Sequence, residues 1–110
     1  MKEFNNRTIH ELKILPRYFE DVVREIKQFE IRRNDRNFKV GDILFLREYE
    51  RGKYTGRSCR VFVKYIYQGD GTFGLTSDFC ILGIDGVHWV YLKYTGNNNT
   101  FYSSRFMKQD

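Results

Sequence analysis

The sequence predicts an α+β protein that is mainly β, a small barrel of six or seven mostly antiparallel strands with one main helix at about residues 16–27. Three observations lead to this fold class. Only residues 16–27 repeat apolar side chains with the period of a helix, whereas most of the later chain alternates as strands do. Turn residues separate these alternating segments. Closing so many strands into a barrel would also remove exposed sheet edges.

The N-terminal part of the chain holds the predicted helix between two strands. Residues Thr8–Leu15 form the expected first strand, and Pro16 follows at a position that suits the first turn of a helix. Phe29–Arg33 is the expected second strand. Between them, apolar residues recur at i, i+3, i+4 and i+7 and define one buried helix face, formed by Phe19, Val22, Val23 and Ile26.

The middle of the chain reads as strands joined by turns. Residues Asp42–Glu50 are apolar on both faces through Leu46, which is typical of a central strand. Arg51–Gly56 is predicted to be a loop that contains two glycines. Arg60–Tyr67 alternates as a strand, and Phe79–Ile84 is a further buried strand.

A hairpin is predicted near the C-terminus, at Asp85-Gly86. A type I′ turn needs positive φ at both central positions, and this dipeptide is among those that favour it. Val87–Tyr94 would then pair with the preceding strand. Gly96–Asn99 predicts another turn, followed by a last short strand within Thr100–Phe106.

Length and composition indicate one globular domain over residues 1–110. An apolar content of 41%, with 17% aromatic residues, is too high for a disordered chain. No apolar run reaches the roughly 18 residues that a membrane helix needs, and the N-terminus lacks the apolar segment of a signal peptide. We therefore expect a cytoplasmic protein without a membrane partner, in which Cys59 and Cys80 are reduced thiols in apolar strands.

Positive charge is concentrated in one third of the chain. The net charge is +5, residues 24–60 contain eleven Lys or Arg and six Asp or Glu, and the remainder contains eight of each. A localised basic surface is typical of proteins that bind a polyanion such as nucleic acid. A solvated face that only aids solubility has the same composition, so charge alone leaves both interpretations open.

The densest group of polar side chains lies in residues 29–42, which read FEIRRNDRNFKVGD. Strand alternation would place Phe29 and Ile31 inward and Glu30 and Arg32 outward. This stretch joins the end of the predicted helix to the central strand, so its side chains converge on one corner. The candidate binding residues are Lys27, Glu30, Arg32, Asn34, Asp35, Arg36 and Tyr54.

The charged candidates have the donors and the acceptor that a nucleotide requires. Lys27, Arg32 and Arg36 are expected to engage phosphate or the edge of a base. Glu30 is expected to accept a hydrogen bond from an exocyclic amine or to orient Arg32. A surface ion-pair cluster with little energetic effect would have the same residues, and it is the alternative to a binding site.

The remaining candidates are assigned to loops. Asn34 and Asp35 are expected to shape the loop, because their side chains hydrogen-bond nearby backbone. Tyr54, in the predicted glycine-containing loop, is a candidate lid that stacks on a base. No metal is expected, because the potential metal ligands are not at ligand spacings; these are His10, Cys59, Cys80 and His88. No cofactor is expected either, because the G-x-G-x-x-G match at Gly69–Gly74 lacks the following helix that a dinucleotide site requires.

Four motifs occur together in the first three quarters of the chain. They are H-x-L-K at His10–Lys13, K-x-F-E-I-R-x-N-D-R-x-F-x-V-G-D at Lys27–Asp42, R-E at Arg47-Glu48 and Y-T-G-R at Tyr54–Arg57. This combination resembles an uncharacterised bacterial and phage family in the ASCH branch of the PUA-like superfamily. The match covers about residues 10–84, and residues 85–110 lie outside it. The resemblance implies a PUA-like β-barrel with a helix beside an open cleft, a fold associated with RNA binding.

The same resemblance implies an alternative, enzymatic activity. Some small ASCH proteins are amidohydrolases that deacetylate N-acetylated cytidine, with a lysine and a threonine in a G-x-K-x-x-T-x-R segment and a distal glutamate. Lys27 and Arg32 match this segment, whereas Glu25 and Glu30 stand at its glycine and threonine positions. The short Gln68–Asp78 segment lacks the insertion that carries the distal glutamate. Lys27 and Glu30 would be the catalytic pair of such an enzyme.

We favour an RNA- or nucleotide-binding module with a cleft at the 27–42 corner, because a carboxylate stands where the hydrolase needs a hydroxyl nucleophile. The first alternative is an amidohydrolase acting on acylated cytidine-type nucleosides. The second is a protein-interaction module that exposes Trp89, Tyr91 and Phe101 on the C-terminal hairpin. The sequence makes no prediction of the oligomeric state.

Overall fold

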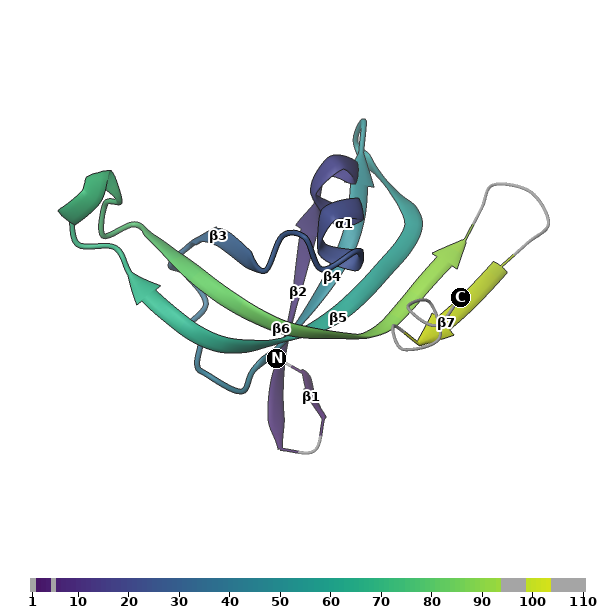
Figure 1. Cartoon of the computed structure of the whole chain (residues 1–110), viewed down its shortest axis with the longest axis horizontal. Helices are drawn as coiled ribbons and strands as arrows, with labels where there is room; N and C mark the ends of the chain where they lie inside the picture. The colour runs from purple at the N-terminus through teal and green to yellow at the C-terminus, as the bar shows by residue number, and fades with distance from the viewer. Residues whose placement is uncertain (1, 5, 94–98, 104–110) are drawn as a thin grey trace.

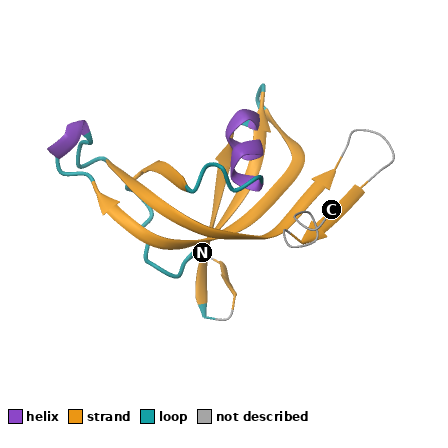
Figure 2. Ribbon diagram, viewed as in Figure 1, coloured by secondary structure: helices purple, strands orange, loops and turns teal. Residues whose placement is uncertain are grey.

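The computed structural model describes residues 2–4, 6–93 and 99–103, and it shows a mainly β protein with one α-helix (Figures 1 and 2). The predicted fold class, α+β and mainly β, is confirmed. Figure 1 shows β5 and β6 as long curved strands, with α1 on one side of the sheet. The elements are β1 (Lys2–Phe4), β2 (Arg7–Ile14), α1 (Pro16–Val23), β3 (Phe29–Arg33), β4 (Ile43–Glu50), β5 (Lys53–Gln68), the 3-10 helix η1 (Thr72–Gly74), β6 (Phe79–Lys93) and β7 (Asn99–Ser103).

The described strands form one sheet in the order β1-β2-β4-β5-β6-β3, and β7 also pairs with β6. β2 and β4 are parallel, with Ile9 opposite Ile43, and the other described pairs are antiparallel. A parallel pair requires a crossover connection, and this one carries α1 and β3. The prediction of mostly antiparallel strands is therefore confirmed, although β1 was not predicted.

The sheet does not close, so the predicted barrel is wrong. β3 is the last strand at one end of the order, and the part of β2 that continues beyond β1 leaves the other end open. Two arginine side chains reach across between these edges. Arg32 Nη2 donates to the carbonyl of Lys13 at 2.8 Å, and Arg36 Nη1 donates to the carbonyl of Glu11 at 2.8 Å. Paired strands lie about 4.8 Å apart, so a direct pairing of β2 with β3 would leave no room for these two side chains. We call this opening the β2–β3 gap.

α1 is shorter than the helix predicted over residues 16–27. Phe19 and Val22 are buried, as the apolar periodicity predicts. The helix ends because Glu25 has a left-handed φ of 61° and the N–H of Ile26 donates at 2.9 Å to a carbonyl five residues earlier. Ile26 is consequently 70% exposed and does not extend the buried face.

β6 continues through Asp85-Gly86, so the hairpin predicted at this dipeptide is wrong. The register with β5 shifts here, since Arg60 lies opposite Trp89 whereas Phe62 lies opposite Asp85. The additional residues on β6 form a bulge, and Gly86 provides the positive φ of 56° at this point. The turn-favouring dipeptide thus modifies a long strand and does not reverse the chain.

The predicted Arg51–Gly56 loop is also wrong, because only its first two residues form the turn. Arg51 and Gly52 have φ of 52° and 82°, the signs that a two-residue type I′ turn requires. Tyr54 therefore lies in β5, opposite Tyr49 of β4. β7 confirms part of the last predicted strand, while residues 94–98 and 104–110, including most of the turn predicted before it, lie outside the described residues.

One apolar core lies between α1 and the sheet. Both cysteines are buried free thiols, as predicted, and burial raises the pKa of each. The largest fully buried side chains of this core include Phe19, Leu44, Leu46 and Leu82. Among the residues whose burial the structure describes, four polar side chains are buried with these apolar ones: His10, Glu30, Asp42 and Glu48.

Candidate functional site

β3 turns Glu30 and Arg32 inward and its apolar side chains outward, which is the reverse of the predicted orientation. Glu30 is 3% exposed, whereas Phe29 and Ile31 are 44% and 53% exposed. Pairing with β6 explains this, because Glu30 lies opposite the fully buried Leu82 and directly opposed residues share one face of a sheet. A buried carboxylate requires charged or hydrogen-bonding partners. Two flanking cations meet that requirement.

Lys27, Glu30 and Arg32 form one ion-pair triad. Arg32 donates to Glu30 Oε1 from Nε at 3.0 Å and from Nη2 at 2.7 Å, so both hydrogen bonds converge on one carboxylate oxygen. Lys27 Nζ donates to Glu30 Oε2 and, at 2.6 Å, to the carbonyl of Phe29. The prediction placed these three side chains together, and they do meet. Their formal charges leave the triad with a net charge of +1.

The triad forms one wall of a cavity of about 450 Å³ at the β2–β3 gap, which we call the Glu30 pocket. Lys27 Nζ lies 5.4 Å from the ring centroid of Tyr18 and 4.8 Å from that of Phe29. Both rings are more than one-third exposed, so cations and open aromatic surface occur together. The lining residues are Lys13, Ile14, Leu15, Tyr18, Lys27, Phe29, Glu30, Ile31 and Arg32.

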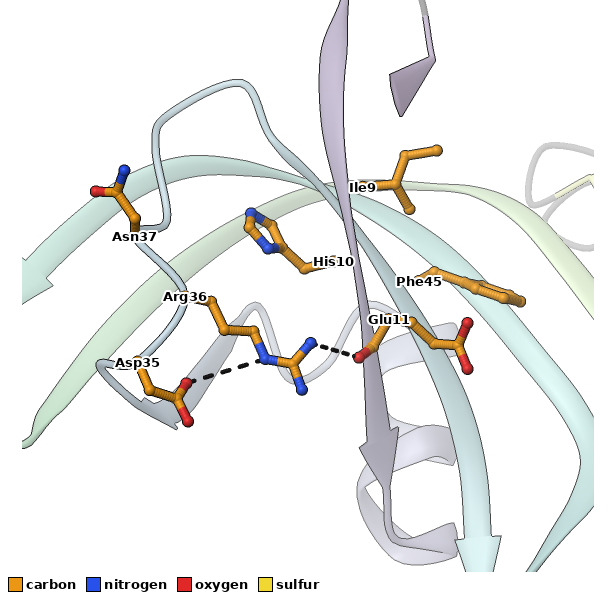
Figure 3. Close-up of a pocket in the computed structure, with 7 residues that line it drawn as sticks. All are labelled: Ile9, His10, Glu11, Asp35, Arg36, Asn37 and Phe45. Carbon is orange, nitrogen blue, oxygen red and sulfur yellow. Dashed lines mark hydrogen bonds and ion pairs between the residues drawn. The ribbon is translucent and has the colours of Figure 1, made fainter. Parts of the chain in front are cut away.

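A second cavity, of about 720 Å³, lies further along the same gap, and we call it the His10 pocket. Figure 3 shows Arg36 extending from the loop after β3 to β2, with Asp35 beside it and the His10 ring on the same side of β2. Arg36 Nε lies 3.9 Å from the carboxylate of Asp35. The lining residues are Ile9, His10, Glu11, Asp35, Arg36, Asn37 and Phe45.

The predicted site residues are therefore divided between several places. Lys27, Glu30 and Arg32 line the Glu30 pocket, whereas Asp35 and Arg36 line the His10 pocket. The other two candidates line neither cavity. Asn34 Nδ2 donates to Gln68 Oε1 at 2.8 Å, and Tyr54 packs against Arg47, whose Cζ lies 3.7 Å from the ring centroid.

Sequence reasoning missed a buried ion-pair cluster beneath α1. Arg57 donates to the buried Glu48 and, at 2.7 Å from Nη1, to Glu20 of α1. Thr55 Oγ1 adds a hydrogen bond of 2.6 Å to Glu48. Burial alone would raise the pKa of Glu48, but the hydrogen bonds from Arg57 and Thr55 hold it below its ordinary value. The R-E and Y-T-G-R motifs contain three of these residues and were the available signal.

Among the described residues, no three His, Cys, Asp or Glu side chains gather closely enough to hold a metal ion. The part of the chain that the structure describes contains no helix long and apolar enough to cross a membrane. Of the residues suggested for protein interaction, Tyr91 lies opposite Phe101 where β6 pairs with β7. The side chains of Trp89 and Phe101 lie outside the described part of the structure.

Fold and site together define a small mainly β domain with an open sheet and two pockets, each lined by both charged and apolar side chains, along the gap between two sheet edges. Comparison with known families identifies it further. The chain belongs to the family described as Domain of unknown function (DUF3850), which matches residues 9–84. This match includes all the residues that line the two pockets.

One curated relative is an uncharacterised 12.9 kDa protein in the GpA 3′ region of Escherichia phage P2. It is 45% identical over 49 residues, which are 44% of this chain and 45% of the relative. The chain thus matches less than half the length of this phage protein. The family match and this phage relative support the resemblance to a family that occurs in phages.

Proposed function

We propose that this protein binds RNA or a nucleotide through the Glu30 pocket, within the corner formed by residues 27–42. The proposal rests on one observation. The exposed rings of Tyr18 and Phe29 and the partly buried cations Lys27 and Arg32 line one cavity of about 450 Å³. Proteins that bind single-stranded nucleic acid combine base stacking on aromatic side chains with cations that contact phosphates. Tyr18 and Phe29 are the stacking surfaces in this proposal.

The triad retains donors for a ligand. An ammonium group has three N–H bonds, and the described partners of Lys27 take two of them, at Phe29 and Glu30. Arg32 uses Nε and Nη2 for its described hydrogen bonds, which leaves the Nη1 donors. A phosphate oxygen or the carbonyl edge of a base is the complementary acceptor. Glu30, already bonded by both cations, orients Arg32 in this proposal.

Two wider observations support the same function. The net charge of +5 arises from residues 24–60, which contain the triad. We also infer kinship with the PUA-like superfamily through its ASCH branch, based on the motifs at His10–Lys13 and Lys27–Asp42. We place the function in the cytoplasm, where buried free thiols such as Cys59 and Cys80 are ordinary.

Binding of labelled single-stranded hexaribonucleotides, measured by fluorescence anisotropy from 25 to 300 mM salt, tests the proposal. We expect affinity to fall as salt rises, because phosphate contacts release counterions. Lys27→Met should weaken binding by about ten- to a hundredfold, the effect of losing one hydrogen bond to a charged group. Arg33→Met is the matched control, because Arg33 is exposed on the outer face of β3, 5.0 Å from the Phe79 ring. Absence of binding at 25 mM salt, or equal effects of the two substitutions, contradicts the proposal.

Amide hydrolysis is a second candidate, favoured by the direct hydrogen bond between Lys27 and Glu30 inside a cavity. An ammonium–carboxylate pair is able to transfer protons while water attacks the amide carbonyl and the amine leaves. Release of free cytidine from N-acetylcytidine should then be detectable by chromatography and should be abolished in Lys27→Met. Turnover that persists in Lys27→Met excludes Lys27 as the catalyst.

A further inference from the structure

His10 is a buried side chain held rigidly by its neighbours. It is 2% exposed, and its Nε2 lies 2.7 Å from Asp42 Oδ2. The same carboxylate oxygen accepts the N–H of Lys39 at 2.9 Å. The imidazole also contacts the edge of the Phe38 ring, with centroids 4.7 Å apart. These contacts fix the plane of the imidazole and the direction of its second nitrogen.

The contact with Asp42 determines the chemistry of that second nitrogen. An ionised carboxylate only accepts, so Nε2 carries the proton in the neutral ring and Nδ1 is an acceptor. Among the described residues, Nδ1 has no hydrogen-bond partner. The His10 side chain lines the His10 pocket together with Arg36 and Asp35 (Figure 3). A nearly buried imidazole thus presents one acceptor to a cavity.

The other polar groups of the His10 pocket are mainly acceptors as well. Glu11 and Asp35 contribute carboxylates, of which Glu11 Oε2 already accepts from Arg47 at 2.7 Å. Arg36 is the single lining cation, and it is engaged by the carbonyl of Glu11. Two carboxylates beside one engaged guanidinium disfavour a phosphate. They favour a ligand that donates hydrogen bonds, such as the hydroxyl groups of a sugar.

The two pockets are neighbours along β2. The arginines that separate them bond to the carbonyls of Glu11 and Lys13, which are two residues apart and hence roughly 6.6 Å apart along a strand. A ligand whose base or phosphate occupies the Glu30 pocket is therefore long enough to place its sugar in the His10 pocket. The cations of the Glu30 pocket match the phosphate or the base edge of a ribonucleotide. The carboxylates of the His10 pocket match the hydroxyl groups of its ribose.

We propose that the His10 pocket binds ribose and that His10 Nδ1 accepts a hydrogen bond from a ribose hydroxyl, so that the protein prefers RNA to DNA. This inference rests on the function proposed above for the Glu30 pocket and specifies its ligand. The 2′-hydroxyl is the group by which a protein tells RNA from DNA at a given position. His10 acts here as a binding residue, and Asp42 acts as a positioning residue that sets its tautomer.

The test compares three hexanucleotides of one sequence that carry 2′-hydroxyl, 2′-hydrogen or 2′-fluorine, each bound to the wild-type protein. Only the hydroxyl donates, so we expect it to bind about three- to tenfold more tightly than the other two, the effect of one hydrogen bond. Equal binding of all three overturns the ribose proposal while leaving the nucleic-acid function intact. Binding of none at low salt overturns both.

A double variant, His10→Phe with Asp42→Asn, provides a second measurement. It removes the acceptor together with the carboxylate that would otherwise remain buried without its partner. If the melting temperature shows that it folds, the ratio of RNA to DNA affinity should fall to about one. A ratio that stays at the wild-type value overturns the role of His10. The wild-type comparison decides the proposal if this variant does not fold.

Discussion

Arg57 holds the carboxylate of Glu48 through two parallel hydrogen bonds, from Nε to Oε1 at 2.8 Å and from Nη2 to Oε2 at 2.6 Å. The pair joins β5 to β4, and a third donor, Nη1, extends to Glu20 of α1. One guanidinium therefore connects the helix to two central strands. Its position beneath α1, away from the lining of either pocket, indicates a structural role.

We predict that Arg57→Met destabilises the protein by about 3 kcal/mol, because it leaves the buried Glu48 without its main partner. Urea unfolding followed by circular dichroism measures this change. Arg24→Met is the matched control, since Arg24 contacts Glu20 only at the surface, at 3.8 Å. Its expected effect is below about 0.5 kcal/mol. Similar losses in the two variants would show that the Glu48 contact contributes little.

The depressed pKa of Glu48 predicts an acid-sensitive contribution to stability. The unfolded chain binds a proton at Glu48 near the ordinary value of 4.5, whereas the folded protein does so only at lower pH. The contribution is thus complete above pH 4.5 and is lost as pH falls through the folded pKa. Between pH 6 and pH 3.5, wild type should lose more unfolding free energy than Glu48→Gln, in urea titrations at both values. Equal losses would exclude this linkage.

The fold class followed from the sequence because periodicity records which residues repeat on one side of an element. The orientation of β3 did not, because alternation fixes only that Glu30 and Arg32 face opposite to Phe29 and Ile31. Which pair faces inward depends on the register with β6 and on Lys27, whose charge compensates Glu30. Both are tertiary relationships that the local pattern does not contain.

The same limit explains the errors at turns and in the site. Asp85-Gly86 has the chemistry of a turn, but pairing with β5 on both sides of it keeps β6 continuous. Asp35 and Arg36 are close to Arg32 in sequence, yet the loop carries them to a different pocket. The triad was predictable because its members are near neighbours across one helix–strand junction. The two pockets depend on β2, which only the fold brings to them.

Gly69 should resist substitution for steric reasons. A Cβ built at this position would lie 1.9 Å from the carbonyl oxygen of Thr76 and 2.5 Å from that of Phe79, so the loop before β6 would have to move. We expect Gly69→Ala to cost about 2–3 kcal/mol, the upper part of the range for overpacked sites, because both contacts are with backbone atoms. Gly71→Ala is the control for conformation alone, because Gly71 has φ of +93° but open space around it, and should cost about 1–2 kcal/mol. Thermal unfolding that ranks the two variants in the opposite order would contradict the steric explanation.

Both thiols should be unreactive in the folded protein. Cys59 and Cys80 are each 1% exposed, and burial raises the pKa of both, so neither the reagent nor the thiolate is available. A chromogenic disulfide reagent at pH 8 should detect fewer than 0.1 thiols per chain within minutes, roughly the reactivity expected of inert buried cysteines. In 8 M urea it should detect both. Rapid reaction of one thiol without urea would show that its strand opens readily.

The orientation of β3 gives the most direct test of the structure against the simplest interpretation of its sequence. Glu30→Val leaves the side chains of Lys27 and Arg32, which are 16% and 20% exposed, without the carboxylate between them. We expect a loss of about 2–4 kcal/mol, because partly buried cations lose their shared anion. Ile31→Thr should change stability by less than about 0.5 kcal/mol, because Ile31 faces outward. The predicted inward orientation of Ile31 would reverse this ranking, since Glu30→Val would then be nearly neutral and Ile31→Thr would remove core packing. Denaturant unfolding of the two variants therefore decides which face of β3 is buried.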